Sequence, residues 1–363
     1  MTSSPQPIAL SVLIPNFNYG RYIRETIESV LSQSMTNLEV VVTDNASTDN
    51  SVEVVRGIAD DRVRLSVNTS NVGFAPNLER VASLARGHRM LLLSSDDRMR
   101  PGALAAYAAL EAALGPKADA AVWGSSVALI DADGRETGSM ALDRKMWGDA
   151  KEEPELSARV GHRVISMPAA ANLRRSLELL RTSLPFASIC YPKALHDRVG
   201  GYAGGRLINP DKWFLWKVLS VAETVYAIDH PLFDYRVHSA GQGPQEARSG
   251  ALKHLTDQYV ATFDVPAYVL EAAGLDREAL ARAFVEHDIA FRGLAAVSEG
   301  RRETARRGIH FGQAAYPSLV MRSPKVWALR MLLGLGPVGT RIARAVRGPA
   351  QARWKQRESR TRR

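Results

Sequence analysis

Residues 10–15 read LSVLIP, and residues 38–43 read LEVVVT. Both are short apolar runs rich in branched side chains, which favours buried β-strands. Two further strands are predicted at 63–67 and 89–93. Apolar residues recur at helical spacing between these runs, and the predicted helices span 21–33, 48–58 and 75–85. Strands that alternate with helices of this length predict a doubly wound α/β domain with a parallel sheet.

The pattern is less regular after residue 101. Residues 140–167 are polar and poorly periodic, so we expect a loop or lid there, with Trp147 as a possible acceptor contact. Cys190 is expected to be a buried core residue that only fills space. The other elements predicted are a helix at 102–114, a strand at 120–130, a turn at 131–134, and helices at 169–184, 213–221 and across most of 252–314. In the last of these, the core positions expected from spacing are Leu280, Phe284, His287 and Phe291.

Composition excludes several classes of protein. With 363 residues, of which 45% are hydrophobic and 23% charged, the chain is long enough for about two domains and is not wholly disordered. A single cysteine excludes a disulfide framework and a cysteine-based zinc site, and is typical of a reducing compartment. We expect no signal peptide and no membrane-spanning helix. The composition therefore indicates a soluble or peripheral protein.

Charge is distributed unevenly along the chain. The net charge is +9, but residues 321–363 alone carry +11, which leaves the rest at −2. Such a basic run is either a solvated tail or an anchor on anionic lipid. Nucleic-acid binding is a weaker interpretation, because no recognition motif accompanies the charge. The apolar residues that would support a lipid anchor are Trp327, Leu329, Leu332, Leu333, Leu335 and Trp354.

Polar residues follow three of the four predicted strands, as PNFNYG (15–20), DNASTD (44–49) and SSDD (94–97). The carboxyl ends of parallel strands meet at one sheet edge, where ligands bind in open α/β folds. The adjacent carboxylates of Asp96 and Asp97 need neutralisation, and Mg²⁺ or Mn²⁺ held with a substrate diphosphate would supply it. There is no glycine-rich phosphate loop, which argues against a kinase, an NTPase or a dinucleotide dehydrogenase.

These blocks, together with NVGF (71–74), NPDKWFL (209–215) and FDYRVH (233–238), resemble the family 2 glycosyltransferases. The resemblance is closest over residues 8–105. It implies the GT-A fold, a Rossmann-like doubly wound mixed sheet with a helical C-terminal extension. The domains expected are a GT-A domain at 1–245, a helical region at 246–320 and a basic amphipathic tail at 321–363.

The resemblance also implies roles for individual residues. Asp211 falls at the position of the catalytic base, and its alternative role is a helix N-cap. Asp97 would hold the metal, with Asp96 on the ribose or on metal-bound water. His238 would lie near the diphosphate as a metal ligand or as a structural residue. The nucleotide would be framed by Pro15, Asn16, Phe17, Asp44 and Asn45.

Three residues depart from the family pattern. Asn45 and Ser94 stand where aspartates are common, and Pro210 replaces an acidic residue before Asp211. The Asn45 departure leaves open whether the base is uracil, thymine or guanine. Arg236 lies in the block near the diphosphate, and its alternative role is an ion pair with an acidic residue of the core.

The activity implied is metal-dependent transfer of a sugar from a nucleoside-diphosphate sugar to an acceptor hydroxyl, with inversion. The acceptor would be a glycan or a lipid-linked molecule, in surface polysaccharide or glycolipid synthesis at the cytoplasmic face of a membrane. Two alternatives remain. A nucleotidyltransferase would have a glycine- and arginine-rich loop after the first strand, where this chain has NFNYG. A non-catalytic binding module would not need both Asp97 and Asp211.

Overall fold

Four parallel strands form the N-terminal half of the sheet: β1 (Leu10–Asn16), β2 (Leu38–Asp44), β3 (Val63–Val67) and β4 (Arg89–Leu92). Their order is β3-β2-β1-β4, with β1 at the centre between β2 and β4. The predicted strands and their parallel arrangement are confirmed. In the β1–β2 register Asn16 is the partner of Asp44, so the polar residues at the two strand ends start side by side.

The first helices connect these strands, as the apolar spacing predicted. They are α1 (Ile23–Leu31), α2 (Ser51–Arg56), α3 (Phe74–Ser83) and α4 (Ala103–Leu114). Ile23, Ile27 and Val30 line one face of α1 and are fully buried against the sheet core. This packing fixes the first turn of α1, and with it the residues that follow β1 at the carboxyl edge.

The remaining strands make the sheet mixed and large. The order continues from β4 through β10, β6, β11 and β9 to β8. Strand β10 is antiparallel to both β4 and β6, whereas β6 and β11 are parallel to each other. The bounds are β5 (Arg98–Met99), β6 (Ala121–Ile130), β7 (Glu136–Met140), β8 (Lys151–Glu152), β9 (Val164–Pro168), β10 (Cys190–Pro192) and β11 (Thr224–Arg236).

The expectation of a loop or lid over residues 140–167 is wrong. This stretch contains α5 (Arg144–Trp147), strand β8, α6 (Pro154–Val160) and most of β9, which pairs with β11. The elements are too short, and several are too exposed, to give an apolar period. Trp147 is buried, and its indole Nε1 donates to the carbonyl of Ser183 at 2.8 Å, so it is a structural residue.

Further helices of this part are α7 (Ala169–Leu179), α8 (Lys193–Arg198) and α9 (Pro210–Val221). The prediction for Cys190 is confirmed. It is 2% exposed in β10, and burial raises the pKa of its thiol to about 12. A thiol in that state is protonated and unreactive at neutral pH.

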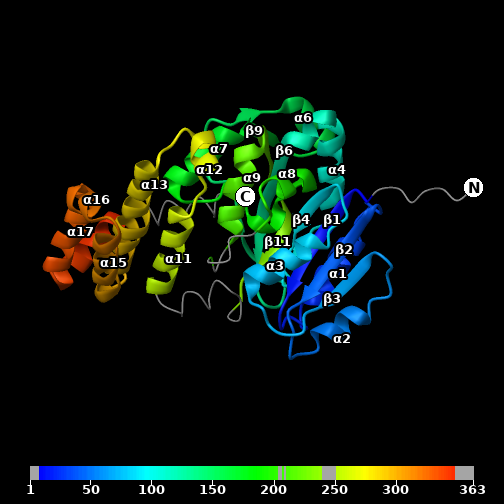
Figure 1. The fold of residues 1–363 in the computed structure, drawn as a ribbon, viewed down its shortest axis with the longest axis horizontal. Coiled ribbons are helices and arrows are strands. Elements are labelled where there is room, and N and C mark those ends of the chain that lie inside the picture. Colours follow the sequence, from blue (N-terminus) through cyan, green and yellow to red (C-terminus); the bar gives the residue numbers. More distant parts are fainter. Residues whose placement is uncertain (1–7, 203–206, 208–209, 239–250, 348–363) are drawn as a thin grey trace, which may run out of the picture. The chain divides into compact units, whose positions relative to one another are not determined.

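The computed structural model describes residues 8–202, 207, 210–238 and 251–347 (Figure 1). The chain divides into a first unit of residues 1–173 and 182–238, and a second unit of 174–181 and 239–363. The second unit is helical where it is described, as expected. Its helices are α11 (Ala251–Phe263), α12 (Ala267–Ala273), α13 (Arg277–Phe284), α14 (Arg292–Ser298), α15 (Arg302–Ala315), α16 (Pro317–Arg322), α17 (Pro324–Gly334) and residues 337–347.

A π-helical segment, η3 (Val285–Phe291), interrupts the expected α-helical period in the second unit. Leu280 and Phe284 are buried as predicted, but Phe291 is 53% exposed and His287 is only half-buried. The wider π turn rotates every later residue away from the face that α-helical spacing predicts. The expectation that His287 and Phe291 are core residues is therefore wrong.

The apolar residues expected to face lipid divide into two groups. Trp327 and Leu335 are exposed, whereas Leu329 and Leu333 are buried within the second unit; Leu332 falls between the two groups and is partly buried. Trp354 lies outside the described residues, together with the basic residues of 348–363. None of the helices that the structure describes is both long and apolar enough to cross a membrane.

Candidate functional site

The ends of β1 and β2 form a hydrogen-bonded pair of polar side chains. Asn16 Nδ2 donates to Asp44 Oδ2 at 2.7 Å, and both residues are almost fully buried. Ser47 donates from its backbone N–H and from its hydroxyl to the two oxygens of the Asp44 carboxylate, at 2.8 and 2.7 Å. Three donors therefore hold this buried carboxylate at the carboxyl edge of the sheet.

The loops that follow these strands are joined to each other. Asn18 has a positive φ of 59°, and its side-chain oxygen accepts the backbone N–H of Thr48 at 2.7 Å. The N–H of Gly20 donates to Asp49 at 2.9 Å. Phe17 lies next to these joined loops and is 39% exposed. An exposed aromatic ring on a fixed backbone is suited to stacking against a planar ligand.

Both the oxygen and the nitrogen of the Asn45 side chain are hydrogen-bonded to other residues of the protein. Its Oδ1 accepts from Asn68 Nδ2 at 3.0 Å and from the N–H of Val72 at 2.9 Å. Its Nδ2 donates to Asn71 Oδ1 at 2.9 Å and to the carbonyl of Gly73 at 3.1 Å. Asn45 therefore fixes the 68–73 loop next to Asp44, and its contact with a base stays a prediction.

The two carboxylates after β4 lie in different environments. Asp97 is 1% exposed, and its Oδ1 accepts the backbone N–H of Arg236 at 2.8 Å. Its Oδ2 is buried without a well-formed hydrogen bond among the described residues, although the Ser94 side chain lies near enough to lower the pKa of the carboxyl. Burial, together with the neighbouring charge of Asp96, raises the pKa of Asp97 well above its usual range. A cation placed nearby would relieve this cost.

Asp96 is the more accessible carboxylate and pairs with His238. Asp96 Oδ2 lies 3.0 Å from His238 Nε2, although the sequence separates the two residues by 142 positions. The rings of Tyr19 and Tyr22 pack against the imidazole, at centroid distances of 5.9 and 5.1 Å. Burial and the charges of Asp96 and Asp97 raise the pKa of Tyr19, so its hydroxyl stays protonated.

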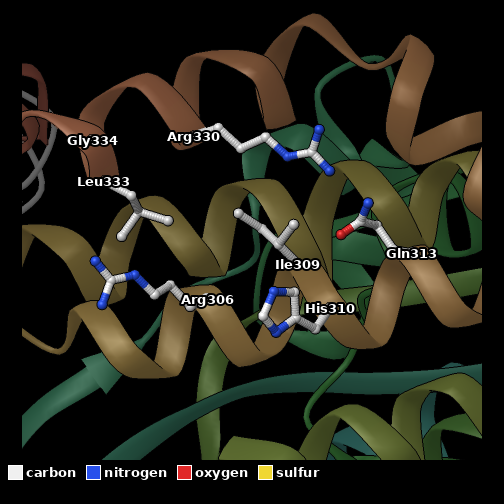
Figure 2. A pocket seen from close by; sticks show the side chains of 7 residues that line it. All are labelled: Arg306, Ile309, His310, Gln313, Arg330, Leu333 and Gly334. Carbon is white, nitrogen blue, oxygen red and sulfur yellow. The ribbon is translucent and has the colours of Figure 1, made fainter.

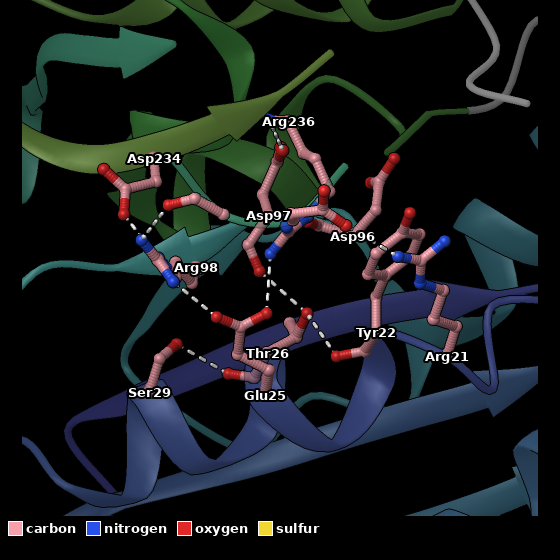
Figure 3. Close-up of polar contacts among 12 residues, drawn as sticks. Arg21, Tyr22, Glu25, Thr26, Ser29, Asp96, Asp97, Arg98, Asp234 and Arg236 are labelled. Carbon is pink, nitrogen blue, oxygen red and sulfur yellow. Dashed lines mark hydrogen bonds and ion pairs between the residues drawn. The ribbon is translucent and has the colours of Figure 1, made fainter. Parts of the chain in front are cut away.

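An ion-pair network contacts the segments that carry Asp96 and Asp97 (Figure 3). Glu25, in the first turn of α1, accepts from the guanidinium groups of Arg98 and Arg236. Arg98 also pairs with Asp234 at 2.5 Å, and Arg236 donates to the carbonyl of Asp96 at 2.7 Å. Arg236 thus pairs with an acidic side chain, but Glu25 is 43% exposed and is not the expected core acid. The network ties α1, the turn after β4 and the end of β11 to one another.

Sequence analysis missed Glu25, Arg98 and Asp234. Arg98 directly follows the two aspartates, and Asp234 stands two residues before Arg236. An alternation of charges next to a buried acidic pair is a weak signal for such a network. Nothing in the sequence indicates that Glu25 is the shared partner.

Asp211 lies in the first turn of α9, one residue inside the start of the helix, and is partly exposed. The positive end of the helix dipole favours a carboxylate there. Tyr202 lies close by: burial is the main cause of its raised pKa, and the charges of Glu79 and Asp211 add to it. Asp211 comes from a different element than the Asp96–His238 pair, and its catalytic role stays a prediction.

A buried lysine supports the start of the segment that leads to α9. Lys217 is 3% exposed, and its Nζ donates to the carbonyls of Val199 and Gly201 at 3.1 and 2.6 Å. Gly200 and Gly201 both have positive φ, so the turn suits glycine. Burial lowers the pKa of Lys217 to about 8.

We expect the stability of the protein to rise with pH between about 8 and 10.5, the range that separates the folded pKa of Lys217 from its ordinary value. In this range the unfolded chain still binds a proton that the folded protein has released. The contribution is on the order of 3 kcal/mol of unfolding free energy. Denaturant titration of wild type and Lys217→Met across this range measures it, as the difference between the two proteins.

The matched control is Lys193→Met, because Lys193 is partly exposed and pairs with Asp197 on the surface of α8. This variant should keep the wild-type pH slope. An equal slope in wild type and Lys217→Met would show that the Lys217 proton does not contribute.

The residues present fit a divalent cation. Asp96 and Asp97 offer oxygen ligands, His238 offers a nitrogen, and one buried Asp97 oxygen lacks a well-formed hydrogen bond within the described residues. The described residues contain no cluster of three or more His, Cys, Asp or Glu side chains arranged to hold a metal by themselves. Such a set suits Mg²⁺ or Mn²⁺, which commonly take one or two carboxylates and complete their shell with phosphate and water.

Residues 11–165 match the family model described as glycosyl transferase family 2. The chain is 34% identical over 90 residues to glycosyltransferase GlyG of Streptococcus pneumoniae. This aligned stretch covers 24% of this chain and 30% of that protein. It is 32% identical over 96 residues to chondroitin synthase of Pasteurella multocida, over 26% of this chain and 10% of that protein. The aligned stretches thus span a third or less of these relatives.

Among solved structures, S. aureus TarS (residues 1–349) in complex with UDP-GlcNAc is similar over 92% of this chain and 89% of that one. The TM-score is 0.59 and the sequence identity 17%, so this likeness concerns the fold. The predicted fold class is confirmed, with a mixed α/β sheet and a helical C-terminal region. Residues 11–165 are therefore similar to glycosyltransferase family 2, and the chain has the GT-A-type fold that it shares with TarS.

Proposed function

We propose that the protein transfers a sugar from a nucleoside-diphosphate sugar to an acceptor hydroxyl. The observation that carries this proposal is the pairing of Asp96 with His238 at the carboxyl edge of the sheet. The Asn16–Asp44 pair lies at the end of the adjoining strands β1 and β2. The proposed diphosphate site and the proposed base site therefore lie at the carboxyl ends of neighbouring strands. A nucleotide needs its two binding sites in this arrangement.

The base would stack on Phe17 and lie against the end of β1, with Pro15, Asn16 and Asp44 below it. The Asp44 carboxylate is fixed by three donors, so it can accept a further hydrogen bond without reorganising. Asn45 would act on the base through the 68–73 loop that it holds in place.

Mg²⁺ or Mn²⁺ would be held by Asp96 and His238, with the Asp97 carboxylate behind them. We assign the direct contact to Asp96 because its carboxylate is the more accessible of the two, whereas Asp97 is buried and bound to the backbone of Arg236. A bound cation would neutralise the charge that develops on the leaving diphosphate. The Glu25 network positions both aspartates by holding Arg98 and Arg236.

Asp211 would take the proton from the acceptor hydroxyl. A single base with direct displacement inverts the configuration at the sugar carbon, because no covalent intermediate is formed on the protein. The name of one relative, chondroitin synthase, supports a growing glycan as the acceptor, and a lipid-linked molecule is the other acceptor that we propose. We further propose that the protein works at the cytoplasmic face of a membrane, as a peripheral protein bound through its basic C-terminal region.

A thermal-shift screen of UDP-, GDP- and dTDP-sugars with and without Mn²⁺ tests the donor assignment. A ligand that binds only the folded state stabilises it by about 2.7 kcal/mol at a concentration of 100 times its Kd. We expect one class of donor to raise the Tm, and the rise to depend on Mn²⁺. The matched readout is release of nucleotide from the same donor. No stabilisation and no turnover with any donor would contradict the proposal.

A further inference from the structure

A pocket of about 450 Å³ lies between α15 and α17 in the second unit (Figure 2). Ile309 and Leu333 are buried and form its apolar floor. Polar side chains from both helices surround this floor, and none of the lining residues is acidic. These polar residues are Arg306, His310 and Gln313 from α15 and Arg330 from α17.

The two guanidinium groups of the pocket are poorly neutralised by the protein. Arg306 approaches Glu303 only at 3.8 Å, and Glu303 lies closer to Arg307, at 3.2 Å. Arg330 stands 5.8 Å from the Trp327 ring and has no carboxylate within ion-pair distance in the described part of the chain. Planar guanidinium groups suit phosphate, which accepts two hydrogen bonds from one side chain. The pocket therefore favours an anion, and a phosphate in particular.

An exposed apolar stripe runs along α17 beside the pocket. Trp327, Met331 and Leu335 are 56%, 69% and 51% exposed, and they recur every four residues on one face. Arg330 and Gly334, which line the pocket, each follow a stripe residue by three positions and so lie next to it on the helix surface. Residues 337–347 continue the exposed apolar spacing with Val338, Ile342 and Val346. Exposed apolar residues that recur on one helix face in this way are typical of an interaction surface.

Charge indicates what covers this surface. Residues 321–347 contain six basic side chains and no acidic one. A second copy of the chain would bring the same basic residues together, and residues 348–363 are themselves strongly basic, so neither fits the pocket. An anionic bilayer offers phosphates at the level of the headgroups and acyl chains directly below them.

We propose that the α15–α17 pocket binds the phosphate of an anionic membrane phospholipid while the apolar stripe enters the acyl region. Arg306 and Arg330 bind the phosphate oxygens, and His310 and Gln313 can add hydrogen bonds. Trp327, Met331 and Leu335 lie beside it in the lipid. This inference rests on the membrane association proposed above, and it adds a defined headgroup site that includes α15, outside the basic region at 321–363.

Sedimentation with phosphatidylcholine vesicles that contain phosphatidylglycerol tests the site in the full chain. Arg306→Gln and Arg330→Gln are compared with Arg307→Gln, which removes the same charge from an exposed neighbouring position on α15. Loss of surface charge alone weakens all three variants to a similar degree. We expect the two pocket variants to lose about tenfold more partitioning than Arg307→Gln, because they also lose hydrogen bonds to a charged group.

Each outcome supports or overturns the proposal. Equal losses in the three variants would overturn the pocket and leave membrane association standing. Displacement of wild type from the vesicles by inorganic phosphate, but not by chloride at equal ionic strength, is expected if the pocket holds the lipid phosphate. Thermal stabilisation of wild type by inorganic phosphate without any displacement from the vesicles would identify free phosphate as the ligand and overturn the lipid assignment. If wild type does not sediment with these vesicles, both the pocket and membrane association fail. Donor turnover, measured in parallel without vesicles, shows whether the proposed transferase activity stands independently of either result.

Discussion

Replacing Asp211 with Asn is expected to slow nucleotide release from the donor sugar by about 10²–10⁴-fold, the usual contribution of a general base. Asparagine keeps the shape of the side chain in the first turn of α9 but cannot accept the proton of the acceptor hydroxyl. Donor binding should not change, because the base and diphosphate contacts that we propose come from β1, β2 and the turn after β4. Turnover is measured with saturating donor and Mn²⁺, and binding by thermal shift.

The control for this variant is Asp229→Asn, which removes a carboxylate from the surface of the same unit, where it pairs with Arg163. It should retain wild-type turnover. If Asp211→Asn keeps wild-type turnover with intact donor binding, another group accepts the proton. If it loses donor binding together with turnover, Asp211 serves in binding and its assignment as the base is wrong.

Asp96→Asn is expected to abolish the Mn²⁺-dependent part of donor binding and to lower turnover by about 100-fold or more. The variant keeps a hydrogen-bond partner for His238 but removes the charge that would hold the cation. Calorimetric titration of Mn²⁺ in the presence of the nucleoside diphosphate measures the affinity directly. Donor-independent stability should change little, since the Asp96 side chain lies at the accessible side of the pair.

Asp97→Asn distinguishes the two carboxylates. If Asp96 makes the direct contact, Asp97→Asn should keep most of the Mn²⁺ affinity, whereas Asp96→Asn loses it. The opposite result would return the metal to Asp97, as the sequence resemblance implies. Asp133→Asn is the surface control, because Asp133 is exposed and pairs with Arg21 outside the carboxylate pair.

The N-terminal half of the fold is predictable mainly because β1, β2 and β4 are buried on both faces. Such strands are continuous apolar runs, and LSVLIP and LEVVVT stand out against the helices between them. The segment at 140–167 gives no such signal, because β8 has two residues and α5 has four. The exposure of Phe291 could not be predicted from the sequence for a different reason. A π-helical turn is set by tertiary packing and leaves no period in the sequence.

The candidate site is predictable only in part. The sequence identifies the blocks that carry Asp44, Asp96 and His238, because strand ends in a parallel sheet converge. It does not show which of the two adjacent aspartates is accessible, since this depends on how the turn after β4 is oriented by Thr26 and Arg236. Nor does it show that Asn45 is satisfied by the 68–73 loop. Pairings over more than 100 positions, such as Glu25 with Arg236, need the folded chain.

The Glu25–Arg98–Arg236 network has a consequence for synthesis of the protein. Residues 11–165 match the family model, but the proposed cation ligand His238 and the guanidinium of Arg236 come from the end of β11 and the residues just after it. A nascent chain that has emerged from the ribosome only as far as β9 therefore exposes two adjacent aspartates without their partners. The donor site is completed late in translation, and proteolytic or genetic fragments that end before residue 238 should be inactive even if their sheet has formed.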